Sequence, residues 1–369
     1  MIFAGLLAVA VAYSILTIVA AWRYRRALRA GSGTVAPISV LKPLAGLEPD
    51  LESNLRSFFE QDYGNFEILF AVRSAGDPAA RVAEKLGREY PRVPSRLVVT
   101  GDPPYPNAKV FSLSHMLAAA ANDLIVMSDS DTRVGPELLN TLNAEFRDPE
   151  VGIATCPYRA VAGPSFWSRL EATSINIDFL AGILVARMIE GMRFAVGPTI
   201  AARRGVLESI GGFDRLKDFL AEDFVMGKFA AQEGHGVILS SYVIEHHIGY
   251  SDLRHNAAHR LRWARSTRRS RPLGYVGQIF TMLLPLAVLA VIAHPSWLPL
   301  LPVALALRAA AAGAIVRGAL HARVSWALVP LADVATFFFW IAGFFGKTIT
   351  WRGRRYRLQR DGRFELLRP

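Results

Sequence analysis

Two acids separated by one residue follow directly on a short apolar run. Residues Leu124-Ile125-Val126-Met127 lead through Ser128 into Asp129-Ser130-Asp131. The apolar run predicts a buried strand of an α/β sheet, and such sheets bind ligands at the carboxyl ends of their strands. Two carboxylates at that point suit a hard divalent cation, Mg²⁺ or Mn²⁺, which prefers oxygen ligands and often brings substrate phosphates with it. An acidic turn after a strand is the alternative explanation, because Asp-x-Asp is short and common.

Three further polar residues stand where ligand chemistry is plausible. Asp77 follows another predicted strand and could contact a ribose or base, or serve only as a helix N-cap before Pro78. Lys109 begins a predicted helix, where it could face a phosphate or simply be a solvated lysine. Asp223, beside Glu222, is a candidate general base that takes a proton from a hydroxyl; an acidic helix cap is its alternative.

A basic and aromatic segment, His259-Arg260-Leu261-Arg262-Trp263-Ala264-Arg265, has a helical pattern and precedes an apolar stretch. Arg262 could pair with a leaving diphosphate, since the guanidinium group matches phosphate oxygens. A membrane-surface helix is the simpler interpretation. The histidines at 246, 247, 255 and 259 lack a His-Glu-x-x-His pattern, so zinc is not favoured.

The elements that would position these residues alternate between strand and helix patterns. Strands are predicted over residues 38–41, 66–72, 96–99, 124–127, 152–156, 194–196 and 237–239, and helices over 51–60, 78–90 and 109–121. This alternation predicts an α/β fold built of βαβ units around a mainly parallel sheet. The one plausible linker is Gly31-Ser32-Gly33.

The chain is too apolar for an ordinary soluble enzyme. Hydrophobic residues make up 52% of its 369 residues, and the mean hydropathy is +0.26. The excess lies in residues 1–21 and in three stretches at 275–293, 297–316 and 326–349, each about the length of ~20 residues that a bilayer crossing needs. Much of the net charge of +11 flanks these stretches, as interface anchors do. The charge therefore points to a lipid bilayer and not to nucleic acid.

The ends of the chain indicate its topology. Positive charge follows the first apolar run, the reverse of a signal peptide, although Ala8 and Ala10 could mimic a cleavage site. We expect an uncleaved anchor that leaves the central domain in the cytoplasm. Three C-terminal crossings would put the basic tail outside, so we expect one stretch not to span, with 326–349 the weakest candidate. The single Cys156 excludes an intrachain disulfide.

The order of these motifs resembles the ceramide glucosyltransferase family, a membrane-anchored branch of the GT-A glycosyltransferases. Its signature of three separated acidic sites and a (Q/R)xxRW motif is matched by Asp77, Asp129-Ser130-Asp131, Asp223 and Arg262-Trp263. The likeness extends to Val40-Leu41-Lys42-Pro43-Leu44 and to Trp351-Arg352-x-x-Arg355-Tyr356-Arg357-Leu358.

The resemblance implies an inverting transfer of a sugar from a UDP-sugar to a lipid hydroxyl. It assigns donor binding to Lys42, Asp77, Lys109 and Asp129, the metal to Asp129 and Asp131, the base to Asp223, and the diphosphate and acceptor to His259, Arg262 and Trp263. The implied organisation is a membrane anchor at 1–22, a GT-A (Rossmann-like) domain at 35–255, an interface helix at 256–272, membrane segments within 275–350, and a basic cytoplasmic tail at 351–369.

One position departs from the signature. His259 stands where Gln or Arg is usual, which resembles the bacterial branch that includes hopanoid-biosynthesis glycosyltransferases. Ceramide-like and hopanoid acceptors, and UDP-glucose and UDP-N-acetylglucosamine as donors, therefore stay open, in a protein expected in the bacterial inner membrane. Two other functions remain: a processive polysaccharide synthase of the same fold, and a non-catalytic membrane protein that binds nucleotide-sugars.

Overall fold

The computed structural model describes residues 1–26, 35–351 and 353–367. The predicted linker Gly31-Ser32-Gly33 and Arg352 of the tail motif lie outside these residues. The chain divides into two compact units, which are described separately. Unit 1 comprises residues 1–28, 162–191 and 250–369, and unit 2 comprises residues 29–161 and 192–249.

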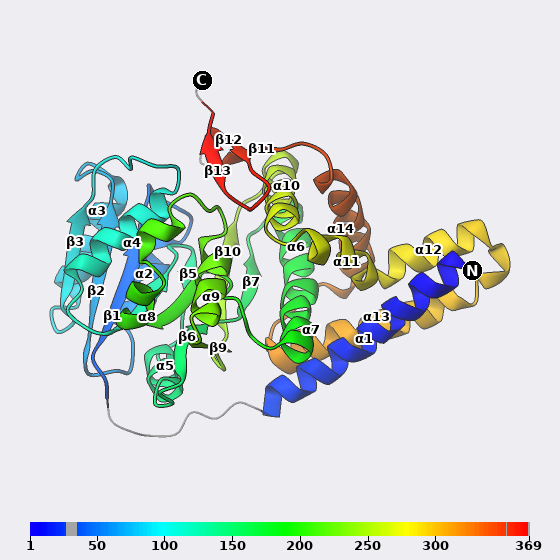
Figure 1. The fold of residues 1–369 in the computed structure, drawn as a ribbon, viewed down its shortest axis with the longest axis horizontal. Helices are drawn as coiled ribbons and strands as arrows, with labels where there is room; N and C mark the ends of the chain where they lie inside the picture. Colours follow the sequence, from blue (N-terminus) through cyan, green and yellow to red (C-terminus); the bar gives the residue numbers. More distant parts are fainter. Residues whose placement is uncertain (27–34, 352, 368–369) are drawn as a thin grey trace. The chain divides into compact units, whose positions relative to one another are not determined.

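Unit 2 is built on a seven-stranded, mostly parallel sheet of order β3-β2-β1-β4-β8-β6-β9 (Figure 1). Its strands are β1 (Ile38–Pro43), β2 (Phe66–Val72), β3 (Ser95–Val99), β4 (Leu124–Ser128), β6 (Val151–Thr155), β8 (Thr199–Arg203) and β9 (Gly236–Leu239). Strands β3, β2, β1 and β4 are parallel neighbours, whereas β8 runs antiparallel to both β4 and β6. The carboxyl ends of β1, β2 and β4 therefore meet at one edge, which confirms the predicted fold class.

Helices cover this sheet and bury their apolar faces against it. They are α2 (Leu51–Phe59), α3 (Pro78–Glu89), α4 (Ala108–Ala119), α5 (Leu138–Glu145), α8 (Arg204–Ser209) and α9 (Glu222–Gln232). Val110, Leu113 and Met116 recur at helical spacing on α4 and pack with Leu41 of β1 and Ile125 of β4 in one buried cluster. Asp77 and Asn107 cap α3 and α4 through their side chains, which fixes where both helices begin.

The predicted strand at 194–196 is wrong. These residues form no strand, and the neighbouring strand is β8, five residues further on. Phe194 and Ala195 are buried because they pack on helix α9: a Cβ placed on Gly227 would lie 2.0 Å from the backbone nitrogen of Ala195. Apolar character at this point thus reflects packing of a loop and not strand pairing.

A second, three-stranded sheet was not predicted. It has the order β5-β10-β7 and consists of β5 (Thr132–Arg133), β7 (Tyr158–Ala162) and β10 (Ile244–Gly249). Strand β5 follows the two aspartates directly, and its antiparallel pairing places His246 opposite Thr132. This pairing brings the histidines of β10 to the acidic loop.

Unit 1 contains the long apolar helices. They are α1 (Ile2–Arg26), the continuous run of α6 (Phe166–Ser174), η1 (Ile175–Phe179) and α7 (Leu180–Glu190), then α12 (Leu283–Ala293), α13 (Leu300–Gly313) with η5 (Ala314–Ala319), and α14 (Val329–Gly343). Helix α1 packs along α12 and α13 (Figure 1), with Ala10, Leu286 and Ala304 in their shared core. Helix α10 (Leu253–Ser270) and α11 (Pro272–Gly277) complete the helical part.

Four helices of the described residues are long and apolar enough to cross a membrane: Ile2–Arg25, Phe166–Glu190, Leu300–Ala319 and Trp326–Gly343. The helix over Phe166–Glu190 was not predicted, because Glu171 and Asp178 interrupt its apolar sequence. A 67° bend separates Pro272–Thr281 from Leu283–Ala293, so this pair is a broken span or a re-entrant segment. The irregular C-terminal stretch is therefore the first one, whereas Trp326–Gly343, within the stretch predicted to be the weakest, is one helix long and apolar enough to span.

Two structural features within unit 1 were not predicted from the sequence. Arg308 of α13 donates hydrogen bonds of 2.9 and 2.6 Å to Asp333 of α14 and one of 2.6 Å to Asp178 of η1. This buried cluster satisfies charges that would otherwise be costly among apolar helices. The basic tail is not irregular: β11 (Thr348–Trp351), β12 (Arg354–Leu358) and β13 (Phe364–Leu366) form an antiparallel sheet.

Candidate active site

The acidic loop after β4 is held in place by the strand and helix beside it. Lys42 of β1, which is fully buried, donates a hydrogen bond of 2.5 Å to the backbone carbonyl of Asp129 and another of 3.3 Å to Ser128. Asn54 of α2 donates to the carbonyl of Ser130, whose hydroxyl donates to Glu48. Burial lowers the pKa of Lys42 to about 7, although Asp129 and Asp131 oppose this shift. In this structure Lys42 thus positions the loop from behind.

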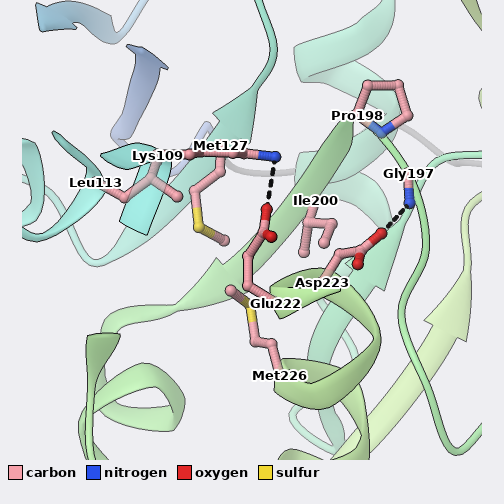
Figure 2. A pocket seen from close by; sticks show the side chains of 9 residues that line it. All are labelled: Lys109, Leu113, Met127, Gly197, Pro198, Ile200, Glu222, Asp223 and Met226. Carbon is pink, nitrogen blue, oxygen red and sulfur yellow. Dashed lines mark hydrogen bonds and ion pairs between the residues drawn. The ribbon is translucent and has the colours of Figure 1, made fainter. Parts of the chain in front are cut away.

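Lys109 lies between two carboxylates at the start of α4. Its ammonium group is 2.7 Å from Asp129 and 2.9 Å from Glu222, the first residue of α9. Figure 2 shows Lys109 pointing toward Glu222 across the pocket that these residues line together with Asp223. Burial opposes the charge on Lys109, but the two carboxylates outweigh it and raise its pKa. Lys109 therefore stays protonated beside Asp129.

Asp223 lies in the same pocket. One carboxylate oxygen accepts a hydrogen bond of 2.8 Å from the backbone N–H of Gly197 (Figure 2). The other accepts one of 2.8 Å from the N–H of Phe224. Burial and the neighbouring charge of Glu222 raise the pKa of Asp223 to about 6, while Lys109 and the two N–H groups oppose the shift. A carboxyl group with this pKa is an effective proton acceptor near neutral pH.

Asp131 faces a histidine of the small second sheet. Its Oδ1 is 3.4 Å from the Nδ1 of His246. This Oδ1 is buried and accepts no hydrogen bond from the described residues. Burial would raise the pKa of Asp131, but His246 and the two lysines lower it to about 2. An ionised carboxylate oxygen that lies 3.4 Å from an imidazole nitrogen suits a cation such as Mg²⁺ or Mn²⁺.

Protein side chains alone do not complete this cation site. Within residues 1–26, 35–351 and 353–367, no group of three or more His, Cys, Asp or Glu side chains is arranged to hold a metal ion. Asp129 forms an ion pair with Lys109, so Asp131 and His246 are the adjacent side chains that could ligate a metal. A cation there needs ligands from outside the chain, such as water or diphosphate oxygens.

Asp77 connects the loops after β1 and β2. Its carboxylate accepts hydrogen bonds of 3.0 and 3.2 Å from the N–H of Gly46 and one of 2.9 Å from Ala79. Asp77 thus caps helix α3, as the alternative interpretation predicted, and it also binds the backbone of Gly46. Lys42, Asp77, Lys109, Asp129, Asp131 and Asp223 all belong to unit 2.

The remaining predicted site residues, His259, Arg262 and Trp263, lie on α10 of unit 1. His259 donates from Nδ1 to the buried carboxylate of Glu171 on α6, which also accepts a hydrogen bond of 2.7 Å from Asn256. The ring of Trp263 lies between His259 and Phe179, with centroid distances of 5.0 and 6.0 Å. Glu171 therefore fixes the orientation of His259 on the motif helix.

Several residues of the site were not assigned a role from sequence. Glu222 was seen only as a neighbour of Asp223, and His246 only as a possible zinc ligand. Asn107 caps α4 and donates a hydrogen bond of 2.8 Å to the carbonyl of Phe219 and one of 3.3 Å to Glu222, so it ties α4 to α9. In the sequence, only the position of Asn107 two residues before Lys109 hints at this connection. Glu171 offered none, because its partner is 88 residues away.

The fold is that of the GT-A glycosyltransferases. The mannosyltransferase of Pyrobaculum calidifontis, solved in complex with GDP-Man and Mn²⁺, superposes with a TM-score of 0.52 at 23% identity, over 93% of this chain and 98% of that one. The sequence pattern of glycosyl transferase family 21 matches residues 2–364. The chain belongs to this family.

Two curated relatives are named for one activity. The chain is 26% identical over 211 residues to ceramide glucosyltransferase 1 of Caenorhabditis elegans, covering 57% of this chain and 45% of the relative. It is 35% identical over 135 residues to the ceramide glucosyltransferase of Komagataella phaffii, covering 35% of this chain and 26% of the relative. The chain thus matches less than half the length of each.

Proposed function

We propose that this protein transfers a sugar from a UDP-sugar, UDP-glucose or UDP-N-acetylglucosamine, to the hydroxyl of a membrane lipid, with inversion at the sugar carbon. One observation carries the proposal. Asp223, a carboxylate whose pKa is raised to about 6, lines the same pocket as Lys109, which is bound to Asp129 of the acidic loop. A base is thereby close to a charged site suited to a diphosphate.

In the proposed reaction the chain binds the donor at the carboxyl ends of β1, β2 and β4. Asp77 contacts the uridine, and Lys109 moves from its carboxylates to the donor phosphates. Asp129 and Asp131 hold a divalent cation, Mg²⁺ or Mn²⁺, with His246 beside Asp131. When bound, the cation supplies positive charge against the leaving diphosphate. The buried Oδ1 of Asp131, which accepts no hydrogen bond from the described residues, supports this role.

Asp223 takes the proton of the attacking lipid hydroxyl in this proposal. The hydroxyl oxygen forms a bond to the sugar carbon while the bond to the diphosphate breaks, and the proton moves to the Asp223 carboxylate. The N–H groups of Gly197 and Phe224 hold the carboxylate in a fixed orientation. Such positioning reduces the reorganisation that the reaction needs.

The motif helix α10 is proposed to serve the diphosphate and the acceptor. By the family resemblance, Arg262 pairs with the departing phosphate oxygens, and His259 and Trp263 contact the donor or the lipid. The hydrogen bond from His259 Nδ1 to Glu171 supports this assignment, because it leaves the Nε2 of the ring as the nitrogen that faces away from Glu171.

A lipid acceptor is supported by two observations. The relatives are named ceramide glucosyltransferases, and four helices of the described chain are long and apolar enough to cross a membrane. We propose a ceramide-like or hopanoid acceptor, and a multi-pass protein of the bacterial inner membrane. Its catalytic domain, residues 35–255 apart from the apolar helix Phe166–Glu190, faces the cytoplasm. In this arrangement residues 1–22 span the membrane. The interface helix at 256–272 and the tail at 351–369 lie at its cytoplasmic surface.

The test is a transfer assay on the purified full chain. It is incubated with UDP-glucose or UDP-N-acetylglucosamine, Mg²⁺ or Mn²⁺, and either a ceramide or a hopanoid with free hydroxyl groups, and the lipid is analysed by mass spectrometry. The proposal predicts a lipid heavier by one sugar with at least one donor–acceptor pair. Chains of several sugars would instead indicate a processive synthase, and donor binding without any lipid product would indicate a non-catalytic binder.

A further inference from the structure

The C-terminal end of α10 carries a cluster of arginines that the proposed reaction does not use. Arg268 and Arg269 are the last basic residues of this helix, and Arg360 lies on the turn between β12 and β13. The turn packs on the helix end, because a Cβ placed on Gly362 would lie 2.7 Å from the hydroxyl oxygen of Ser270. All of these residues belong to unit 1.

Three donor atoms of this cluster lack acceptors among the described residues. The Nε atoms of Arg268 and Arg269 and the Oγ of Ser270 are shut off from water, and none has a hydrogen-bond partner among the described residues. Arg268 uses its other nitrogens on the carbonyls of Phe344 and Gly346. A buried donor without an acceptor is costly, so this end of α10 carries a hydrogen-bonding deficit that adds to its excess of positive charge.

The charges in the cluster are of one sign. Burial lowers the pKa of Arg269, and repulsion from Arg268 and Arg360 lowers it further. In the part of the chain that the structure describes, Arg269 and Arg360 form no ion pair. Arg357 and Arg363 on the same hairpin do, with Glu365 at 3.5 Å and Asp361 at 3.3 Å. Three guanidinium groups without a carboxylate match an anion with several oxygens, above all a phosphate group.

The place of the cluster indicates where such a phosphate comes from. Two residues after Ser270 the chain enters the apolar pair Pro272–Thr281 and Leu283–Ala293, which has the length and composition of a broken span or a re-entrant segment. Basic residues at the start of an apolar segment lie at the level of lipid headgroups. Arg268, Arg269 and Ser270 are half-buried residues and Arg360 is exposed, so a headgroup can approach the cluster from the side of Arg360, while the Nε and Oγ atoms named above stay covered.

We propose that Arg268, Arg269, Ser270 and Arg360 form a binding site for a phosphate group, occupied in the membrane by the headgroup of an anionic phospholipid. The site joins the end of the motif helix α10 to the C-terminal hairpin through the bound phosphate. It is independent of glycosyl transfer and would exist in a protein without that activity.

The experiment measures thermal unfolding of the purified full chain in a neutral detergent. Phosphatidylglycerol, phosphatidylcholine or inorganic phosphate is added at matched phosphate concentration. The site variant is R269Q/R360Q, and the matched control is R357Q/R363Q, which removes the same charge from arginines that already have carboxylate partners. The single variant R360Q changes only an exposed side chain, so it serves if the double variant does not fold.

The expected result is a rise of the unfolding midpoint with phosphatidylglycerol, for the wild type and the control, that the site variant loses. Phosphatidylcholine and inorganic phosphate should give a smaller rise. Without lipid, the site variant should unfold no earlier than the wild type, because it has lost like-charge repulsion. An equal rise of the unfolding midpoint with phosphatidylglycerol in the site variant and the control would contradict the proposed site. A full rise with inorganic phosphate alone would overturn the lipid assignment, and a lower lipid-free midpoint of the site variant would overturn the need for an anion.

Discussion

Replacing Asp223 by asparagine removes the proposed base and keeps the size of the side chain. A general base contributes typically about 10²- to 10⁴-fold to the rate, so D223N should lower kcat by that factor, or by about 3–5 kcal/mol in the activation barrier. The asparagine oxygen can keep one of the two hydrogen bonds, from Gly197 or Phe224, and the other N–H loses its acceptor. That loss costs about 1–3 kcal/mol of folding stability.

The pH dependence of the wild type follows from the same group. Because the pKa of Asp223 is raised to about 6, the ionised, proton-accepting form is present above pH 6 and is lost below it. Asp223 is ionised in roughly nine-tenths of the enzyme at pH 7 and in about one-tenth at pH 5. The activity of the wild type should therefore fall about tenfold between pH 7 and pH 5, whereas the residual activity of D223N should lack this limb.

Glu222 offers an independent check on this titration. Its charge raises the pKa of Asp223, so E222Q should move the acid limb of kcat to lower pH. The assay measures initial rates of sugar transfer at saturating donor from pH 4.5 to 8. Donor affinity is measured separately by binding of UDP, and D214N, which changes an exposed carboxylate, serves as the control. Turnover of D223N within threefold of the wild type, with the acid limb unchanged, would refute the assignment of Asp223 as base.

Other parts of the structure give further expected outcomes. G227A places a methyl group 2.0 Å from the backbone nitrogen of Ala195, so it should destabilise the fold by about 1–3 kcal/mol in denaturant unfolding and lower activity by displacing α9. E171Q replaces the carboxylate that orients His259, so we expect a lower kcat with little change in the unfolding midpoint. E171D, which keeps a carboxylate, should retain more activity than E171Q, and E171A should not. R308M leaves the buried carboxylate of Asp333 and the half-buried one of Asp178 without their cation and should cost about 3–5 kcal/mol in thermal or denaturant unfolding. Chelation of divalent cations should stop transfer, with activity returning on addition of Mn²⁺; full activity in excess chelator would remove the cation from the reaction.

Much of unit 2 was predictable because its strands are short, apolar and separated by capped helices. The strand before Asp129 and the helices that begin at Pro78 and near Lys109 were found within one or two residues. Strand β8, Thr199–Arg203, was not found, because three of its five residues are alanine or arginine and give no strand pattern. The tail strands were missed for a similar reason, since charged residues dominate their sequence.

The predicted site residues were the ones whose function depends on local sequence. Asp129, Asp131 and Lys109 follow a strand or begin a helix, so their positions could be predicted from spacing. Their partners could not be predicted, because they come from distant segments. Glu222 contacts Lys109 from the start of α9, and the pairing of β10 with β5 brings His246 to Asp131. Lys42 shows the limit most clearly, since a lysine in a strand gives no sign that it is buried behind the acidic loop.

A single carboxylate that deprotonates a lipid hydroxyl supports only one displacement at the sugar carbon. The most direct measurement is therefore the anomeric configuration of the sugar in the lipid product, determined by NMR on product made by the wild-type protein. The proposed role of Asp223 predicts a configuration opposite to that of the UDP-sugar donor. Retention of the donor configuration would contradict it, because retention requires a second displacement or a different mechanism.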